Sequence, residues 1–387
     1  MREFRVESYD YFLPPELIAT QPVEPKSAAR LLVFERASKR VTHTTFASLC
    51  EVLPECEIVF NDTKVIKARL FGRKQSGGAV EVLLNQPLGE GVFNAFVRGK
   101  VKVGVKIEFD LNLTAEVVEL CEDGSRKLAF NCTTNELFSL CEKIGSVPLP
   151  PYIKREATEQ DESWYQSYFA KYSGAVAAPT ASLHFDEEMI SKLRQNHEIH
   201  TLTLHVGAGT FKGVECEEIT QHKMHSEFFS IPQSVAELIA SDAKILGVGT
   251  TVTRVVEFYT RAVLGLVEKS GEAEALRADL GEILKSNSVL TNSLSLQKLL
   301  AQTSVSQNEL KALQSGFCDL FLHPHNKPLR QNFLLTNFHL PKSTLIMLVA
   351  AFVGLDETMR LYEEAVSEGY RFYSYGDGML ILSLIHI

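Results

Sequence analysis

A run of short β segments interrupts the sequence between residues 64 and 147. Segments such as GAVEVLLNQ, VFNAFVRGK and LTAEVVEL mix β-branched, aromatic and polar residues, and Gly, Asp and Asn separate them. This pattern is typical of a small β meander or barrel. The run ends at GSVPLPPYIKRE, whose three prolines are typical of a linker. We therefore expect residues 64–147 to form an inserted, small all-β domain that resembles a barrel.

The sequence on both sides of this insert has a different pattern. Apolar strands such as LTLHVG and KILGVG alternate with helical stretches such as TRVVEFYTRAVLGLV, which is typical of an α/β domain around a buried sheet. The length of 387 residues also favours two domains. We expect residues 1–63 and 148–382 to form one discontinuous α/β domain. Residues 264–316 are predicted to be a surface excursion with one or two helices, and residues 383–387 a C-terminal tail.

Composition excludes several classes of protein. The net charge of −9 gives no overall basic footprint for nucleic acid. Seven cysteines without a C-x-x-C pair argue against a disulfide framework and a zinc site, and the histidine pairs have no third ligand at matching spacing, so we expect no metal. The apolar TLIMLVAAFVG is too short to cross a membrane, and the first residues carry charges where a signal peptide needs an apolar block. We expect a cytoplasmic protein that does not bind membranes.

Two glycine turns follow predicted strands. In TLTLHVGAGTF, His205 comes at the end of a strand, directly before Gly207 and Gly209. In ILGVGTTVTRVVE, Gly249 and Thr250 precede a helix, whose first N–H groups favour an anion. Ligands of open α/β sheets bind at the carboxyl ends of strands, so both turns are candidate sites. The alternatives are a histidine hydrogen-bonded at a sheet edge and an ordinary helix cap. Neither turn matches the Rossmann or the Walker pattern.

A third candidate site lies in NFHLPKSTLIML. Lys342 stands at a predicted helix start, with His339 just upstream and Ser343 or Thr344 available as a cap. A lysine there opposes the helix dipole unless it meets an anion, so Lys342 is a candidate ligand. The alternative is a solvated lysine.

The insert carries a basic stripe. In VRGKVKVGVKIEF every second position is basic over most of the segment, which predicts one basic face of a strand containing Arg98, Lys100, Lys102 and Lys106. Further basic residues precede it, among them Lys64, Lys67 and Arg69. Either this face binds nucleic acid, or it is the solvated side that every β domain needs.

The segment AAPTASLHF raises the question whether it is a turn or a site, because small residues and two hydroxyls lead directly to His184. This segment and eight others, in order, resemble the S-adenosylmethionine:tRNA ribosyltransferase-isomerases of queuosine biosynthesis. The other eight are YFLPPELIATQPVEPKSAARLLV, VFNDTKVIKARLFG, PLPPYIKR, TLHVGAGTFKGV, HKMHSEFF, VGTTVTR, LLTNFHLPKSTLIMLV and YRFYSYGDGMLIL. The family commonly has glycine at the position of Ser182, so we expect a modest penalty there if that residue needs φ > 0 or must let a ligand approach its backbone.

The resemblance implies an activity. The ribosyl part of S-adenosylmethionine would be transferred and isomerised onto the 7-aminomethyl group of 7-aminomethyl-7-deazaguanine at the tRNA wobble position, giving epoxyqueuosine, adenine and methionine. S-adenosylmethionine would be a consumed co-substrate, and we expect a monomer. The chemistry needs a base for a proton on the 5′ carbon, an acid for departing adenine and donors around the ribose.

The resemblance also suggests roles for individual residues. His184, His205 and His339 are the acid and base candidates. The residues expected to bind substrate or tRNA phosphate are Asp62, Arg155, Thr180, Arg254, Lys342 and Asp377, and those expected to shape the pocket are Gly207, Gly209, Gly249, Thr250 and Asn337. Asp377 could equally be a turn residue. The residues expected to contact tRNA from the insert are Lys64, Lys67, Arg69, Arg98, Lys100 and Lys102.

Two other functions stay open at this point. A tRNA-binding module without activity would also use the basic stripe. A methyltransferase would form S-adenosylhomocysteine, but the failed glycine fingerprint weakens this alternative.

Overall fold

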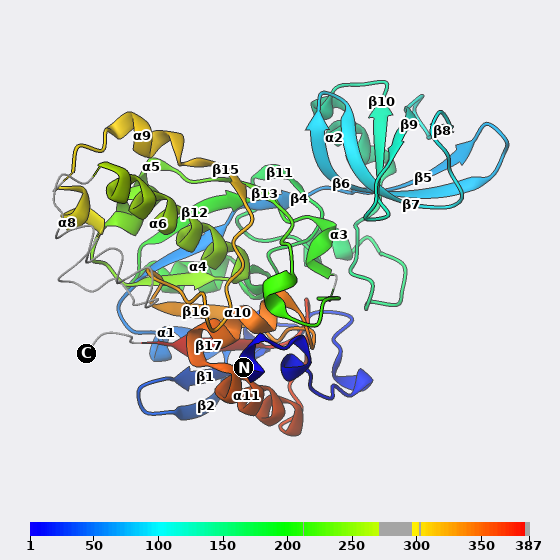
Figure 1. Cartoon of the computed structure of the whole chain (residues 1–387). Helices are drawn as coiled ribbons and strands as arrows, with labels where there is room; N and C mark the ends of the chain where they lie inside the picture. The colour runs from blue at the N-terminus through cyan, green and yellow to red at the C-terminus, as the bar shows by residue number, and fades with distance from the viewer. Residues whose placement is uncertain (212, 271–295, 302, 384–387) are drawn as a thin grey trace. The chain divides into compact units, whose positions relative to one another are not determined.

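The computed structural model describes residues 1–211, 213–270, 296–301 and 303–383. Contacts divide the chain into two units (Figure 1). Unit 1 comprises Met1–Asp62, Pro179–Leu204 and Lys212–Ile387, and unit 2 comprises Thr63–Ala178 and His205–Phe211. Unit 2 begins one residue before the predicted insert and extends beyond its predicted end at residue 147, because the proline-rich segment and a short later segment pack with it.

In the described part of unit 1, nine strands form one mixed sheet in the order β15-β13-β12-β3-β14-β16-β17-β1-β2. The four central strands β12, β3, β14 and β16 run parallel, and antiparallel strands flank them. Together with the helices, this confirms the predicted α/β fold class. The strands are β1 (Arg30–Glu35), β2 (Arg40–Thr45), β3 (Glu57–Asn61), β12 (Ile199–Leu204), β13 (Glu227–Ser230), β14 (Ile245–Val248), β15 (Ser315–Cys318), β16 (Phe333–Asn337) and β17 (Gly378–Leu382).

Helices pack against this sheet. The longest, α6, contacts β12, β3, β14 and β16. The helix α10 is apolar around its whole circumference and is accordingly buried, with Ser343 as its N-cap as predicted. The helices of unit 1 are α1 (Leu49–Val52), α4 (Glu187–Leu193), α5 (Gln233–Ala240), α6 (Thr250–Ser270), α8 (Leu296–Leu300), α9 (Gln307–Ala312), α10 (Thr344–Val353) and α11 (Leu355–Ser367). Its 3₁₀ helices are η1 (Arg2–Phe4), η2 (Val6–Tyr9), η3 (Pro15–Leu17), η4 (Lys26–Ala28), η5 (Phe46–Ser48), η6 (Thr180–His184) and η8 (Ile219–Gln221).

A buried carboxylate on α6 holds the chain that enters β16. Glu257 is fully buried and accepts hydrogen bonds from the backbone N–H groups of Leu329 (2.6 Å), Arg330 (2.9 Å) and Gln331 (2.8 Å). Arg261 donates to the same carboxylate at 2.9 Å. Charge-assisted bonds of this kind are about twice as strong as neutral ones, so Glu257 fixes where β16 starts.

In the described part of unit 2, six strands close into a barrel in the order β10-β7-β6-β5-β8-β9, as the all-β prediction for the insert required. Alternate side chains such as Val80, Val82 and Leu84 are buried inside, in keeping with the period of two of a strand. The strands are β5 (Arg69–Lys74), β6 (Ala79–Gly89), β7 (Val92–Arg98), β8 (Lys106–Glu108), β9 (Thr114–Leu120) and β10 (Arg126–Phe130). The unit also contains β4 (Thr63–Val65), β11 (Tyr172–Ala175), α2 (Thr134–Ile144), α3 (Asp161–Trp164) and η7 (Ala208–Phe211).

The prediction of one strand bearing Arg98, Lys100, Lys102 and Lys106 is wrong. The strand β7 ends at Arg98, and β8 begins only at Lys106. Gly99 (φ +127°) and Gly104 (φ +84°) adopt left-handed conformations between them and turn the chain. Lys100 and Lys102 therefore lie in an exposed loop.

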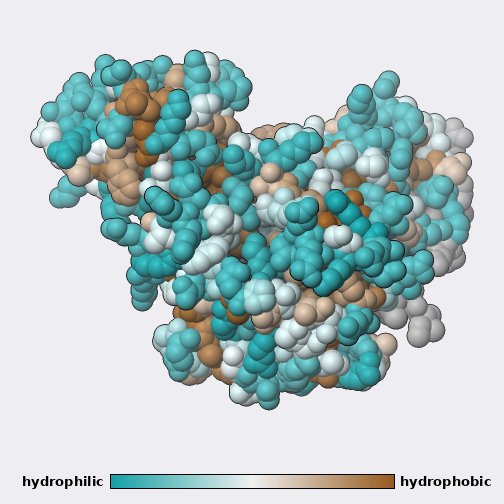
Figure 2. All heavy atoms as spheres, turned by 180° about the vertical axis from the view of Figure 1, so that it is seen from behind, coloured by the Kyte–Doolittle hydropathy of each residue, from teal (hydrophilic) through white to brown (hydrophobic). Residues whose placement is uncertain are grey.

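The predicted excursion and tail are only partly described. The helix α6 extends into the excursion as far as Ser270, and α8 and α9 follow, but residues 271–295 and 302 lie outside the described part, as do residues 384–387 of the tail. Leu296 and Leu299 of α8 are buried, so this helix is packed rather than superficial. Within the described residues, no helix is both long and apolar enough to cross a membrane. Hydrophilic side chains cover most of the face in Figure 2, and apolar ones appear in small groups.

The role of Glu257 gives a first prediction. Glu257→Gln replaces one acceptor oxygen by an amide that faces backbone donors, so we expect the free energy of unfolding to fall by about 2–4 kcal/mol. The matched control is Glu363→Gln, an exposed position on α11 that should change stability by less than about 0.5 kcal/mol.

Urea denaturation followed by circular dichroism measures both variants. The single tryptophan, Trp164, lies in unit 2, so its fluorescence reports that unit separately. Equal midpoints for the two variants would contradict the role assigned to Glu257.

Candidate functional site

Polar residues gather where the parallel strands of unit 1 end, an edge that we call the carboxyl edge. Asp62 follows β3, Gly249 follows β14, and Asn337 is the last residue of β16. The antiparallel β17 begins beside Asn337, since Gly378 pairs with it, so Asp377 lies at the same edge. The structure thus brings together residues from four separate segments that the sequence singled out, at the place where open α/β sheets bind ligands.

The helix η6 adds Thr180 and His184 to this edge. It contacts β16, and a Cβ atom on Gly249 would lie 3.6 Å from that of Ala181. The residues from Ala181 to His184 are all buried. Ser182 does not adopt a positive φ, so a serine there causes no backbone strain of that kind, and the alternative that a ligand approaches its backbone stays a prediction.

A phenylalanine fixes the His184 ring. The Phe46 ring stacks on the imidazole with a centroid distance of 4.1 Å and an interplanar angle of 16°. Gly378 makes room for it, because a Cβ atom there would lie 2.7 Å from the Phe46 ring. Phe46 is buried and also meets Phe185 edge to face. Stacking on one face restricts the ring of His184 to one plane.

Three buried polar atoms near this edge lack a hydrogen-bond partner among the described residues. They are Ser182 Oγ, His184 Nε2 and Asn337 Oδ1. The Asn337 amide nitrogen, by contrast, donates to the carbonyl of Tyr373 at 2.9 Å, which fixes the orientation of the side chain. Since an unpaired buried polar group costs about 1–3 kcal/mol, three in adjoining segments indicate a site that a polar ligand completes.

The two candidate histidines of unit 1, His184 and His339, differ in their surroundings. Burial lowers the pKa of His184 to about 3, the charge of Arg371 adds to this effect, and the amide of Asn337 opposes it. Burial alone lowers the pKa of His339 to about 3. The Nε2 atom of His339 already bonds the Thr336 hydroxyl at 2.8 Å. Both rings are therefore neutral at neutral pH, and His184 has the ring nitrogen that a ligand can use.

Asp62 and its neighbour Asn61 join β3 to β12. Asp62 accepts a hydrogen bond from the Thr203 hydroxyl at 2.6 Å. The Asn61 side chain donates to the carbonyl of Leu204 at 2.9 Å and accepts from its N–H at 3.1 Å. These side-chain hydrogen bonds continue the pairing of β3 with β12 beyond the last backbone hydrogen bonds between the two strands.

Arg254 and Asp377 are engaged by the protein. The Arg254 guanidinium is buried, pairs with Glu227 and donates to the carbonyls of Leu320 and Cys318, both at 3.1 Å. Asp377 accepts from the backbone N–H of Arg30 (3.0 Å) and of Arg371 (2.8 Å). These contacts indicate that Arg254 and Asp377 stabilise the fold. For Asp377 they agree with the alternative that it is a turn residue rather than a substrate ligand.

Lys342 also has protein partners. It lies two residues before α10, in a left-handed conformation with φ +55°, rather than inside the helix start. Its ammonium group pairs with Glu7 at 3.0 Å and Asp10 at 2.9 Å, and these bonds raise its pKa. The anion that the sequence led us to expect beside Lys342 is thus supplied by the N-terminal segment.

His205 belongs to unit 2 and follows directly after β12. Its Nδ1 atom lies 2.7 Å from the Thr63 hydroxyl. The ring packs over Gly174, where a Cβ atom would come within 2.8 Å of it. Burial lowers the pKa of His205 to about 4. The following turn with Gly207 and Gly209 is tied to the barrel, because the N–H of Ala208 donates to Asn85 at 2.8 Å.

Arg155 is the other predicted substrate ligand in unit 2. It donates two hydrogen bonds to Asp161, at 2.6 and 2.8 Å. Burial acts to raise the pKa of Asp161, but bonds from Arg155 and Thr158 outweigh it and lower the pKa to about 2. This pair orders the segment between the barrel and β11.

Four of the six basic residues predicted to bind tRNA have acidic partners within unit 2. Lys64 pairs with Glu142 at 3.5 Å, and Lys67 pairs with Glu162 at 2.6 Å. Arg69 and Arg98 both pair with Glu81. Lys100 and Lys102 are exposed.

One group among the described residues has the composition of a metal site. Ligand atoms of Glu57, Glu198 and His200 lie within 4.8 Å of one another. His200 Nε2 bonds Glu57 at 2.9 Å, which accounts for this contact without an ion. The group lies where β3 and β12 begin, at the other end of these strands from the carboxyl edge.

Sequence reasoning missed two residues of the site. Phe46 and Gly378 are far apart in the chain, and neither lies in a recognisable polar turn. Only the pairing of β17 with both β16 and β1 brings Gly378 to Asn337 and Phe46 to Gly378. The segment YGDGMLIL gave a partial signal, since it contains a glycine at a strand start.

Comparisons with known proteins cover nearly the whole chain. Residues 6–381 match the model of a family described as "Queuosine biosynthesis protein". An S-adenosylmethionine:tRNA ribosyltransferase-isomerase from Campylobacter fetus is 53% identical over 384 residues, which is 98% of this chain and 99% of that protein. A protein of the same name from Nitratiruptor is 49% identical, over 98% of each chain. A crystal structure of S-adenosylmethionine tRNA ribosyltransferase from Thermotoga maritima is 30% identical over 97% of this chain and 100% of that one, with a TM-score of 0.48.

The lowered pKa of His184 predicts a pH dependence of stability. His184 binds a proton near pH 6.5 in the unfolded chain but only near pH 3 in the folded chain. The free energy of unfolding that the neutral His184 ring contributes is therefore fully present above pH 6.5 and is lost as the pH falls toward 3. Each such histidine adds a slope of about 1.4 kcal/mol per pH unit within this window.

We expect His184→Gln to reduce that slope by about 1.4 kcal/mol per pH unit between about pH 6 and pH 4. Urea unfolding at a series of pH values measures it. An unchanged slope would show that His184 titrates alike in the folded and unfolded chains.

The stacking contact gives a further prediction. Phe46→Leu removes the ring current over His184, so the ring protons of His184 should move downfield and the pKa of His184 should rise. The matched control is Phe352→Leu, which removes another buried phenylalanine, on α10. NMR of histidine-labelled protein measures the ring-proton shifts and the pKa of His184. The His184→Gln variant identifies the His184 signals, because they are missing from its spectrum. Equal shifts in the two variants would contradict a direct effect of Phe46.

Proposed function

The chain belongs to the queuosine biosynthesis protein family, and we propose that it is an S-adenosylmethionine:tRNA ribosyltransferase-isomerase. It transfers and isomerises the ribosyl part of S-adenosylmethionine onto the 7-aminomethyl group of 7-aminomethyl-7-deazaguanine in tRNA. The products are epoxyqueuosine-tRNA, adenine and methionine. The full-length similarity supports the reaction, and the unpartnered polar atoms of Ser182, His184 and Asn337 are the observation that assigns the chemistry to the carboxyl edge.

His184 is the preferred candidate for the base. The sulfonium group of S-adenosylmethionine acidifies the 5′ carbon next to it, so a neutral acceptor nitrogen suffices at close range. His184 is neutral because burial lowers its pKa, its Nε2 is unpartnered among the described residues, and Phe46 fixes its plane. His339 is bonded through Nε2 to Thr336, so we assign it a supporting role in holding the chain after β16.

Other residues at the carboxyl edge have the chemistry to hold the substrate. Asn337 Oδ1 and Ser182 Oγ can bond ribose hydroxyls or the adenine amino group. The first N–H groups of α6, starting at Thr250, offer a positive helix end for a carboxylate such as that of the methionine part. Thr180 and Asp62 complete the polar lining that we propose.

His205 is the candidate acid for departing adenine. Its bond to Thr63 fixes the ring, and burial keeps it neutral before the reaction, so its task would be to pass on a proton that it receives during turnover. Gly207 and Gly209 are proposed to let a ligand approach the adjoining backbone. Arg155, Arg254, Lys342 and Asp377 are proposed to act by holding these segments in place, since each is engaged by protein groups.

Several finer points belong to the same proposal. The modified base is at the wobble position of the tRNA, and the basic residues of unit 2 attract its phosphates. We propose that the enzyme needs no metal, acts as a monomer and is cytoplasmic. All seven cysteines lie in the described part and are free thiols, which is the usual state in a reducing compartment.

Incubation of the purified protein with S-adenosylmethionine and tRNA carrying the aminomethyl-deazaguanine base tests the proposal. We expect equimolar adenine and methionine, measured by chromatography, and none with tRNA that carries guanine instead. S-adenosylhomocysteine as the product would indicate a methyltransferase. Tight tRNA binding without any product would indicate a binding module.

Histidine variants then separate the roles. His184→Ala should lower kcat by about 10²–10⁴-fold, the usual effect of losing a general base. The matched control is His197→Ala, another buried histidine of unit 1, whose ring bonds the carbonyl of Cys56 at 3.0 Å. This control should keep a near wild-type kcat. Similar losses in both variants would mean that His184 acts only through stability.

A further inference from the structure

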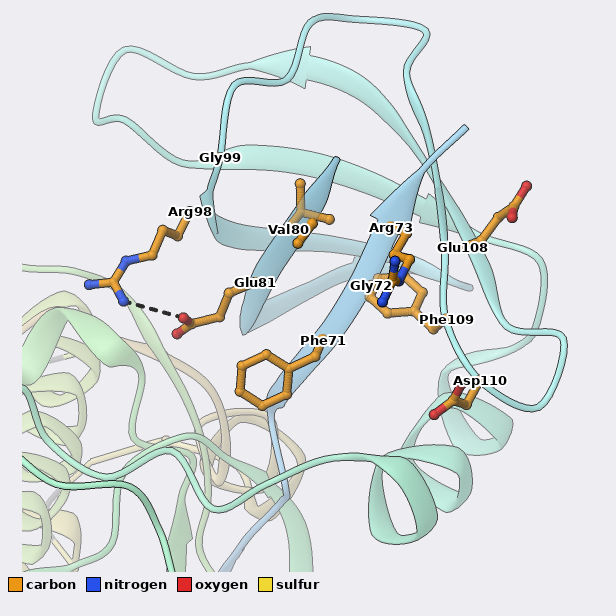
Figure 3. A pocket seen from close by; sticks show the side chains of 11 residues that line it. Phe71, Gly72, Arg73, Val80, Glu81, Arg98, Gly99, Glu108, Phe109 and Asp110 are labelled. Carbon is orange, nitrogen blue, oxygen red and sulfur yellow. Dashed lines mark hydrogen bonds and ion pairs between the residues drawn. The ribbon is translucent and has the colours of Figure 1, made fainter. Parts of the chain in front are cut away.

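An exposed phenylalanine lies in a hollow on the barrel of unit 2, which we call the Phe71 hollow. Phe71, on β5, is 59% exposed, although the rest of its strand alternates between buried and polar residues. The hollow has a volume of about 720 Å³, and its walls come from β5, β6, the end of β7, β8 and the two residues after β8 (Figure 3). A large aromatic side chain left in water at the rim of a hollow indicates a contact surface.

Charged side chains flank Phe71 in a fixed register. Phe71 lies directly opposite Glu81 on β6, and Glu81 lies opposite Arg98 on β7. Arg98 donates to Glu81 at 3.4 Å, and its side chain is 86% exposed (Figure 3). Arg73 follows two residues after Phe71 and so shares its face of the strand. On this outward face Glu81 therefore lies between Phe71 and Arg98, and Arg73 lies two residues along the strand from Phe71.

Glycine leaves part of the rim without a side chain. Gly99 has φ +127°, and a Cβ atom there would lie 2.9 Å from Val80 Cγ1. Backbone rather than side chain therefore forms this wall, next to Arg98. Flat groups such as nucleobases can approach backbone closely in such places.

The charge of unit 2 is unevenly distributed along its sequence. Residues 64–110, which contain β5 to β8, have nine lysines and arginines and four acidic residues, a net charge of +5. Residues 111–178 have six basic and ten acidic residues, a net charge of −4. The lining of the Phe71 hollow itself holds two arginines, Arg73 and Arg98, and three acidic residues, Glu81, Glu108 and Asp110, within this basic part of the sequence. The excess of basic charge comes from residues outside the lining, among them Lys74, Lys100 and Lys106, so attraction of phosphates depends on the surroundings of the hollow and not on its lining.

We propose that the Phe71 hollow binds an unpaired nucleotide of the tRNA, with the base stacked on Phe71 and the adjoining phosphates paired with Arg98 and Arg73. This inference rests on the proposed function, which supplies tRNA as the partner. Proteins bind single-stranded nucleic acid with exposed aromatic rings on β-barrels together with cationic side chains, because every base has a π face and every linkage a negative charge. Glu108 and Asp110, which also line the hollow, can accept hydrogen bonds from base amino groups.

The charges around Phe71 argue against a protein partner. The centre of a protein interface is depleted in charged residues, whereas the neighbours of Phe71 across and along the strands are Glu81 and Arg73. Arg98 is mostly in solvent, and it can keep its bond to Glu81 while its other nitrogen atoms reach a phosphate.

Binding of fluorescein-labelled tRNA that carries the aminomethyl-deazaguanine base, measured by anisotropy over a series of salt concentrations, tests the inference. Phe71→Ala should weaken binding about 5-fold to 100-fold, the usual effect of losing one stacked base, without changing the salt dependence. Phe71→Tyr keeps an aromatic ring and should bind within about twofold of wild type. Arg98→Ala should instead lower the slope of log Kd against log salt by about 0.7–0.9.

Two controls separate stacking from general damage. Leu120→Ala removes another exposed apolar side chain of the barrel, on its acidic half, and should not change binding. A fully paired RNA duplex should bind wild type and Phe71→Ala equally, since it offers no free base. Wild-type tRNA affinity of Phe71→Ala, with its circular dichroism intact, would overturn the inference.

The proposed function and this inference can fail independently. If wild-type protein releases adenine and methionine but Phe71→Ala binds tRNA normally, only the inference is wrong. If Phe71→Ala weakens tRNA binding but no product forms, the hollow binds RNA and the proposed activity is wrong. A higher KM for tRNA in Phe71→Ala, with unchanged kcat and unchanged KM for S-adenosylmethionine, is the expected kinetic result.

Discussion

The buried carboxylate of Glu257 is the interaction on which the candidate site depends. A charged group in a protein interior is costly unless hydrogen bonds satisfy it, and here three consecutive backbone N–H groups and Arg261 do so. These bonds lock the residues that lead into β16 against α6. Because β16 is parallel to β14 and antiparallel to β17, its position decides where Asn337 meets Gly378. Local electrostatics in the core thereby sets the geometry of the carboxyl edge.

Charged and neutral polar residues have different roles in this protein: the charged ones form ion pairs that stabilise the fold, and the neutral ones include buried atoms without a partner among the described residues. The cations Arg254 and Lys342 are bound by acidic partners and stabilise segments of unit 1. The neutral groups of His184 and Asn337 are buried with unpartnered atoms, which a stable fold would otherwise avoid.

The sequence was sufficient for the fold class, and it singled out several residues that the structure brings together at the carboxyl edge. The alternation of apolar strands and helices predicted the α/β sheet, and short strands between Gly and Asp predicted the barrel, because period and turn chemistry are local properties. The turn after a predicted strand singled out Gly249, and the resemblance singled out Asp62 and Asn337; all three lie at the carboxyl edge, and their part in the reaction stays a prediction. Pairing between distant segments is not local, so neither the stacking of Phe46 on His184 nor the ion pair of Arg254 with Glu227 was foreseen. The basic stripe failed because Gly99 and Gly104 broke the expected strand.

The central claim is that the unpartnered nitrogen of His184 receives a substrate. Titration of ¹⁵N-histidine-labelled protein with S-adenosylmethionine, followed by NMR and assigned through His184→Gln, tests it most directly. The account predicts a large change in the Nε2 resonance of His184 and little change in that of His339, whose Nε2 atom is already bonded to Thr336. Saturable binding of S-adenosylmethionine that leaves the His184 Nε2 resonance in place would contradict the account.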